Sequence, residues 1–174
     1  MPSLLQNLRR EYVPTLPDLL KDINTLSISP SNNLLEKHSP LEKIFPKTYQ
    51  QPRLSIVKDK IRKNSPLRIG FVFSGGQAAG GHNVVTGLFD ALKRMHEGSS
   101  LWGFIDGPKG IIENNAKEIT YEILAPYRNQ GGFDLVGSGR TKIETKEQFE
   151  AAAQTVKELE LDGLVIVGGD DSNT

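Results

Sequence analysis

The sequence predicts an α/β protein: a three-layer α/β/α architecture on a mostly parallel sheet, preceded by a helical or irregular N-terminal extension. Two observations carry this prediction. Beyond residue 66, apolar runs alternate with segments of helical spacing, which is the pattern of a parallel sheet covered by helices on both faces. All 17 glycines lie at or after Gly70, whereas eight of the ten prolines lie at or before Pro66. Two kinds of polypeptide therefore meet near Pro66.

The charge divides at the same place. Residues 1–66 hold 11 basic and 6 acidic side chains, and residues 67–174 hold 10 and 15. The net charge of zero removes the composition argument for nucleic acid or a membrane surface as partner. Without cysteine, neither a disulfide nor a thiolate site is available. We expect a cytoplasmic protein, because the sequence has no secretion signal and no apolar run near the roughly 18 residues of a membrane span.

Residues 1–66 are predicted to be an extension of short helices separated by prolines. Asp18 offers an acidic helix start after Pro17, and residues 31–33 can cap a helix over 34–37. These pieces are too short for a core of their own, so we expect them to pack on the main domain or on a partner chain. We interpret the basic run Lys58–Lys63 as a solvated linker rather than an anion-binding arm.

Residues 67–174 are predicted to be the first part of the α/β domain, with strands and helices in alternation. The expected strands are 67–73, 101–105 and 163–167, and the expected helices are 83–97 and 146–160. The stretch 117–127 stays ambiguous, with a short helix ending near Pro126 as one interpretation. Ligands of such sheets bind at the carboxyl ends of the strands, where two glycine-rich loops fall here.

The first candidate site is the loop Ser74–Gly81, which joins a strand to a helix. Its paired glycines, Gly75 and Gly76, let backbone amides approach an anion, and the following helix adds the positive end of its dipole. The loop lacks the lysine of a Walker loop and the G-x-G-x-x-G spacing. By itself it is equally well interpreted as a tight turn without a ligand.

The second candidate is the loop that begins at Gly168, after the most apolar strand. Its adjacent carboxylates, Asp170 and Asp171, repel each other unless a cation compensates, and Mg²⁺ carrying phosphate oxygens would do so. An acidic helix start is the alternative interpretation.

The third candidate is the segment 137–142, in which flexible glycines deliver Arg140 and Lys142 together, as a phosphate site needs. Taken alone, that segment is slightly better interpreted as a loop with solvated bases. Among the three histidines, His82 adjoins the first loop, where we favour a role at the start of the helix over base chemistry.

Taken together, the three loops resemble one family. The strings FSGGQAAGGHNVVTGLFD, GFIDGPKGI, YRNQGGFDLVGSGRTKIET and LDGLVIVGGDDSNT look like the diphosphate-dependent phosphofructokinases of the long, plant-like type. The resemblance covers about residues 67–174. It implies a phosphoryl transfer from pyrophosphate to the 1-hydroxyl of fructose 6-phosphate, giving fructose 1,6-bisphosphate and phosphate. It also implies reversibility, a place in glycolysis and gluconeogenesis, and Mg²⁺ as cofactor.

The resemblance also implies roles for individual residues. It makes Asp170 the Mg²⁺ ligand, and it makes Asp171 and Arg140 catalytic, with Arg140 bridging the donor phosphate and the sugar phosphate. The residues implied to contact the diphosphate are the glycines and the serine of two loops: Gly75, Gly76, Gly169 and Ser172.

Two positions bear on the choice of phosphoryl donor. Relatives that use ATP have glycine where this sequence has Asp171, whose carboxylate would repel the α-phosphate of ATP. Pro108 lies where such relatives often carry a tyrosine near the nucleotide. Both positions favour pyrophosphate over ATP.

The family's P-K-T-I-D-G-D segment, with its aspartate base and a lysine that meets pyrophosphate, would lie beyond Thr174. We therefore expect an N-terminal fragment that is inactive alone and, in the whole enzyme, a homo-oligomer or a paired-subunit oligomer. Three alternatives stay open: an ATP-dependent phosphofructokinase, an NAD kinase with a similar GGD loop, and a non-catalytic regulatory subunit of the same family. An NAD kinase would not be expected to carry the SGGQAAGGHN and GSGRTKIET strings.

Overall fold

The structure is a computed structural model that describes residues 2–31, 40–47, 49, 51–61 and 63–172. It forms two compact units. The larger unit comprises Met1–Pro14 and Asn64–Thr174, and the smaller one comprises Thr15–Lys63. The boundary between the units thus falls between Lys63 and Asn64, and the first 14 residues belong to the larger unit.

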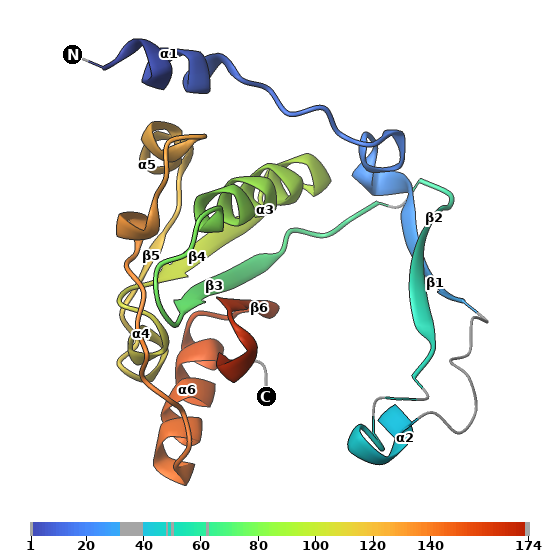
Figure 1. Ribbon diagram of the computed structural model, residues 1–174, viewed down its shortest axis with the longest axis vertical. Helices are drawn as coiled ribbons and strands as arrows, with labels where there is room; N and C mark the ends of the chain where they lie inside the picture. The colour runs from blue at the N-terminus through green and yellow to red at the C-terminus, as the bar shows by residue number, and fades with distance from the viewer. Residues whose placement is uncertain (1, 32–39, 48, 50, 62, 173–174) are drawn as a thin grey trace. The chain divides into compact units, whose positions relative to one another are not determined.

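A four-stranded sheet with the order β5-β4-β3-β6 is the centre of the larger unit (Figure 1). Its strands are β3 (Arg68–Ser74), β4 (Ser100–Phe104), β5 (Ala116–Glu118) and β6 (Gly163–Gly168). β3 pairs in parallel with β4 along one edge and with β6 along the other, and β5 runs antiparallel to β4. The three predicted strands are confirmed to within one residue, and the sheet is mostly parallel, as predicted.

Helices cover both faces of this sheet (Figure 1). They are α3 (Gly81–Met95), α4 (Pro108–Ile112), α5 (Tyr121–Leu124) and α6 (Lys146–Glu158). α6 begins with a capping box, in which the Thr145 hydroxyl accepts from the Gln148 amide and the Gln148 side chain accepts from the Thr145 amide. The ambiguous stretch 117–127 contains the end of β5, the helix α5 and a 3₁₀ turn, Ala125–Tyr127.

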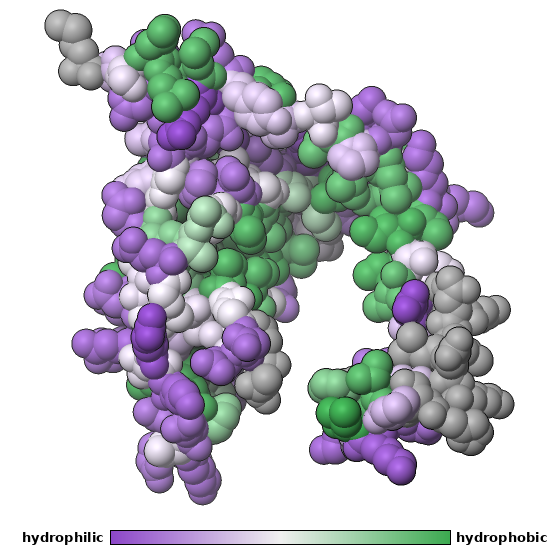
Figure 2. All heavy atoms as spheres, viewed as in Figure 1, coloured by the Kyte–Doolittle hydropathy of each residue, from purple (hydrophilic) through white to green (hydrophobic). Residues whose placement is uncertain are grey.

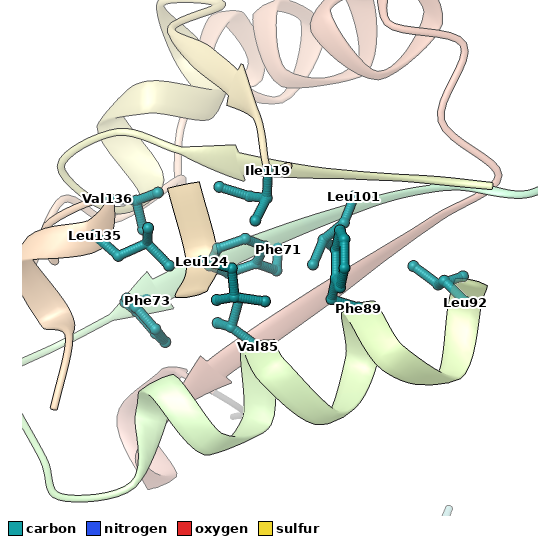
Figure 3. Close-up of a cluster of buried hydrophobic side chains, with 10 residues drawn as sticks. All are labelled: Phe71, Phe73, Val85, Phe89, Leu92, Leu101, Ile119, Leu124, Leu135 and Val136. Atoms are coloured by element: carbon teal, nitrogen blue, oxygen red, sulfur yellow. The ribbon is translucent and has the colours of Figure 1, made fainter. Parts of the chain in front are cut away.

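The main core lies between the sheet and α3 (Figure 3). Phe71 and Phe73 point from β3 to this face, and their rings meet edge to face with centroids 5.5 Å apart. Alternate residues of a strand point to opposite faces, so Val72 points the other way. The ten buried hydrophobic residues of this core are Phe71, Phe73, Val85, Phe89, Leu92, Leu101, Ile119, Leu124, Leu135 and Val136.

A smaller core fills the opposite face. Val72, Phe104 and Ile111 are buried there, with Ala152 of α6 and Leu159 packed against them. α4 and α6 are therefore the layer on this face, and α3 is the layer on the other. The predicted three-layer α/β/α architecture is confirmed.

The first helix, α1 (Leu4–Glu11), contacts the rest of the larger unit through polar groups. The Asn129 side-chain amide donates to the carbonyls of Arg9 and Tyr12, and the Gln130 side-chain amide donates to the carbonyl of Gln6. The Arg9 carbonyl also accepts from the Tyr12 amide at the end of the helix. They explain why the first residues group with a segment more than 100 positions away in the sequence.

The smaller unit differs from the expectation of short helices alone. It contains an antiparallel pair of strands, β1 (Leu26–Ser31) and β2 (Arg53–Lys58), beside α2 (Pro40–Ile44). Leu26 and Ile28 in β1, and Leu54 and Ile56 in β2, are two positions apart, which is strand spacing. The predicted helix start at Asp18 is a 3₁₀ turn, Asp18–Leu20, and the predicted helix over 34–37 lies outside the described residues.

The surface of this smaller unit is rich in hydrophobic side chains (Figure 2). Ile28 of β1 is 67% exposed and Leu54 of β2 is 66% exposed. All six residues of β2 are exposed, and Tyr49 is the only buried hydrophobic residue among those that the structure describes in this unit.

Candidate active site

Three chain segments meet at the carboxyl end of β3. Ser74, the last residue of β3, lies opposite Gly168, the last residue of β6. On the other edge, Ser74 forms an isolated parallel bridge with Gly139. The two glycine-rich loops and the arginine segment therefore start side by side, because the sheet places their strand ends together.

The loop after β3 depends on glycine for its backbone conformation. Gly75 has φ +104° and Gly80 has φ +93°, and a β-carbon at either would have open space around it. The Gly75 amide donates to the Gly139 carbonyl at 2.7 Å. Gly80 is the N-cap of α3 and offers no side chain to the first amides of that helix. The loop therefore leads into a helix N-terminus whose amides have no side-chain cap.

Arg140 extends over this loop. Its Nη2 atom lies 3.1 Å from where a β-carbon on Gly76 would be, so any larger residue at position 76 would crowd the guanidinium. The Arg140 side chain is exposed. The structure therefore places a positive charge directly beside the paired glycines.

The acidic loop lies on the other side of the β3 end. Asp170 and Asp171 are exposed in the 3₁₀ turn Asp170–Ser172. The hydroxyl of Ser172 lies 2.9 Å from the hydroxyl of Ser74, which ties this turn to β3. The close approach requires Gly168, since a β-carbon there would come within 2.7 Å of Ser172 Cβ.

One open cleft of about 1470 Å³ joins these groups. Pro108 and Lys142 line it as well, next to the residues predicted from sequence. The structure thus brings together every residue that the sequence analysis singled out for this site: Gly75, Gly76, Arg140, Gly169, Asp170, Asp171 and Ser172.

The oxygen donors at the acidic loop fit a hard divalent cation. Two adjacent, exposed carboxylates are the ligand type that Mg²⁺ takes from a protein when phosphate oxygens and waters complete its shell. Over the residues that the structure describes, no group of three or more His, Cys, Asp or Glu side chains could enclose a metal. A metal held here would therefore need oxygen ligands beyond those of the protein.

His82, at the second position of α3, is half-buried, and this burial lowers the pKa of its imidazole. The neutral form is favoured at neutral pH. Its place at the helix start agrees with the role that the sequence favoured.

Two features of the site were missed by sequence reasoning. One is the hydroxyl of Ser74, which contacts Ser172. The other is the turn Asp106-Gly107 after β4, which packs directly on Gly139. The Asp-Gly-Pro sequence indicates a turn there, but its contact with a segment some 30 residues away had no local signal.

Comparisons with known proteins identify the family to which the chain belongs. The family model for phosphofructokinase matches residues 68–174, which is more than half of the sequence. The chain belongs to the phosphofructokinase family. All the candidate site residues lie within the matched range.

Several curated relatives are similar over almost the whole chain. A pyrophosphate–fructose 6-phosphate 1-phosphotransferase of Treponema pallidum is 48% identical, covering 99% of this chain and 32% of the relative. The beta subunit of the enzyme of the same name from Solanum tuberosum is 46% identical, with 99% and 31% covered. The chain thus spans about a third of the length of these relatives. Among solved structures, Pichia pastoris phosphofructokinase in the T-state aligns with 19% identity and a TM-score of 0.46, over 62% of this chain and 11% of that one.

Among the described residues, no helix combines the length and the apolar character that crossing a membrane requires.

Proposed function

We propose that this chain supplies the phosphoryl-donor half of an enzyme that transfers a phosphoryl group from pyrophosphate to the 1-hydroxyl of fructose 6-phosphate. The observation that carries the proposal is the single cleft in which Arg140 lies over Gly76 while Asp170 and Asp171 stand at the adjoining strand end. The names of the two relatives described above support the same reaction.

The groups of the cleft match the charge of the donor. Pyrophosphate is a compact polyanion, and the loop 75–80 with the uncapped start of α3 offers backbone amides to it. Arg140 would neutralise the phosphoryl group as it moves. In the transfer, the sugar oxygen forms a bond to phosphorus, the bridging P–O bond breaks, phosphate leaves, and the hydroxyl proton passes to a base. Placing fixed positive charge where negative charge develops is the main source of catalysis in such reactions.

We assign Asp170 as the residue that would hold Mg²⁺, with the donor's phosphate oxygens as further ligands. When bound, the ion would neutralise the phosphates and keep them oriented for transfer. Asp170 suits this role because its carboxylate is exposed to the cleft beside the loop that would hold the donor. The protein's own part is to fix that carboxylate on a short turn anchored by the Ser74–Ser172 contact.

We assign the choice of donor to Asp171. Its carboxylate follows Asp170 and lines the same cleft, and we infer that a donor longer than two phosphates would extend toward it. Two negative groups about 4 Å apart repel by a few kcal/mol at intermediate dielectric, so a nucleoside triphosphate would be disfavoured. Pro108, which also lines the cleft, offers no aromatic face for an adenine base.

We further propose that the enzyme is cytoplasmic, acts in glycolysis and gluconeogenesis, and works as a homo-oligomer or with a paired subunit. The name of the potato relative, a beta subunit, supports an assembly of subunits. The reaction supports reversibility, because it exchanges one phosphate compound for another without consuming a nucleotide.

The test is an assay of the full-length protein encoded by the gene. We expect fructose 1,6-bisphosphate to form only when pyrophosphate, fructose 6-phosphate and Mg²⁺ are all present, with one phosphate released per sugar phosphorylated. ³¹P NMR of the mixture follows donor, sugar product and phosphate together. Pyrophosphate hydrolysis without sugar phosphorylation would contradict the proposal, and so would phosphorylation that requires ATP.

A further inference from the structure

We propose that Gly107 and Gly139 are positioning residues for the reaction: their backbone contact holds Arg140 over the loop of residues 75–80, here called the diphosphate loop. This inference rests on the proposed function, because it concerns the residue that would neutralise the transferred group. Neither glycine has a side chain that could meet a substrate. They would affect the reaction by fixing the position of the Arg140 side chain.

The contact between the two glycines is backbone against backbone. A β-carbon on Gly107 would overlap the backbone nitrogen of Gly139 and would come within 2.7 Å of its Cα. A β-carbon on Gly139 would overlap the carbonyl oxygen of Asp106 and would come within 3.1 Å of the Asp106 carbonyl carbon. Because backbone atoms cannot move aside as a flexible side chain can, neither position admits even alanine without a shift of the chain.

The segment before Arg140 is held on both sides. The Gly139 carbonyl accepts from the Gly75 amide at 2.7 Å, which joins the segment to the diphosphate loop. The Asp106 amide donates to the Val136 carbonyl at 2.8 Å, which joins it to the turn after β4. Asp106 and Gly107 have φ of 57° and 79°, a left-handed turn that presents backbone rather than side chain to Gly139. Gly139 is therefore fixed between β3 and this turn.

Arg140 is the next residue, so its position follows from that of Gly139. To relieve the overlap created by a methyl group at Gly139, the backbone must move by about 1 Å, and the root of the Arg140 side chain moves with it. A misplacement of about 1 Å in a group that acts in the transition state can cost on the order of 100-fold in rate. The two glycines would thus affect catalysis without touching a substrate.

Gly139 is the better position to test. Gly107 has a positive φ, so any substitution there adds backbone strain to the overlap. A substitution at Gly139 adds only steric crowding of the new β-carbon, since the φ of Gly139 lies outside the left-handed range. Gly87 of α3 is a matched control, because a β-carbon there meets nothing within 4 Å.

The experiment is a double-mutant cycle in the full-length protein, with Gly139→Ala, Arg140→Ala, the double variant and Gly87→Ala. The measured quantities are kcat/KM for pyrophosphate, assayed at one temperature below the unfolding midpoint of the least stable variant, and the affinity for pyrophosphate by calorimetry at the same temperature. We expect Gly139→Ala to lose on the order of 100-fold in kcat/KM. In the Arg140→Ala background, Gly139→Ala should lower kcat/KM by less than a further threefold. The single variant Gly87→Ala should have the kcat/KM of wild type. A contact that only stabilises the fold would not show this dependence on Arg140.

Losses that multiply in the double variant, or wild-type activity in Gly139→Ala, would overturn the inference. If Gly139→Ala does not fold, a glycine inserted between Gly139 and Arg140 decides the question: it keeps the backbone contact but lengthens the tether by up to about 3.6 Å. Its activity should then fall to the level of Arg140→Ala, and retained activity would refute the role. A wild-type protein inactive with pyrophosphate would instead refute the proposed function.

Discussion

The ion pair between Asp90 of α3 and Arg128 connects the helix behind the diphosphate loop to the segment that also contacts α1. Arg128 donates two hydrogen bonds to the carboxylate, Nη1 to Oδ2 at 2.9 Å and Nη2 to Oδ1 at 2.6 Å. Its guanidinium also lies 5.8 Å from the centre of the Tyr121 ring. The hydrogen bonds that Arg128 donates to Asp90 raise the pKa of Arg128 above its ordinary value. We predict that Asp90→Ala lowers the free energy of unfolding by about 1–2 kcal/mol.

The magnitude follows from geometry and burial. Charge-assisted hydrogen bonds contribute about 1.5–3 kcal/mol when buried, whereas fully exposed pairs contribute about 0–1 kcal/mol. Here the side chains of Arg128 and Asp90 are 28% and 38% exposed, so the expected value lies between these limits. The Arg128 Nε atom is buried and has no hydrogen-bond partner among the residues that the structure describes, so removing the carboxylate leaves a partly buried charge with less compensation.

Urea denaturation of this chain, followed by circular dichroism, measures the loss. Glu150→Ala is the matched control, since the Lys146–Glu150 pair is 3.6 Å long with side chains 84% and 66% exposed. We expect that control to change the free energy of unfolding by less than about 0.5 kcal/mol. If Asp90→Ala and Glu150→Ala have equal effects, the bidentate pair does not stabilise the unit and the reasoning from its geometry is refuted.

Three further predictions concern the core, the metal and pH. Gly103→Ala should lower the free energy of thermal unfolding by about 1–3 kcal/mol, because its methyl group would come within 2.6 Å of Val136 Cγ1. The control Gly87→Ala should be neutral or slightly stabilising. Equal unfolding midpoints for the two variants would contradict this. Asp170→Asn in the full-length protein should remove most activity and raise the Mg²⁺ concentration needed, since an amide is a poorer ligand; activity within about threefold of wild type would show that Asp170 is not the ligand. Because burial lowers the pKa of His82 below 6.5, its stabilising contribution is fully present above pH 6.5 and falls as the unfolded chain binds the proton at lower pH. The stability of His82→Asn should therefore fall less between pH 7 and pH 5 than that of wild type, and parallel curves would refute the assignment.

The elements that the sequence predicts well are those with strong local patterns. β3 and β6 are short apolar runs followed by glycine pairs, and α6 combines a capping box with helical spacing. β5 has only three residues and exists because β4 offers it an edge, so no local pattern could identify it. In the smaller unit, the prolines are typical of helix ends, whereas the pairing of β1 with β2 joins two segments more than 20 residues apart.

Some features of the site can likewise be predicted from local sequence, whereas others depend on contacts between distant segments. Glycines and carboxylates at strand ends are visible in the sequence because parallel strands bring their carboxyl ends together, so the positions of Gly76, Arg140 and Asp170 in one cleft could be predicted. The packing of Gly107 on Gly139 could not, because it is a contact between two turns some 30 residues apart whose glycines look locally like ordinary turn residues. The Ser74–Ser172 contact likewise depends on the pairing of β3 with β6.

The central claim, that the donor is pyrophosphate and that Asp171 excludes ATP, is tested most directly by comparing kcat/KM for the two donors in full-length wild type and Asp171→Gly. We predict that wild type prefers pyrophosphate. In Asp171→Gly, the ratio of ATP to pyrophosphate efficiency should rise at least about tenfold, which corresponds to about 1.4 kcal/mol, because charge and bulk are removed from the place of the α-phosphate. A wild type that prefers ATP, or a ratio that does not change in the variant, would contradict the account.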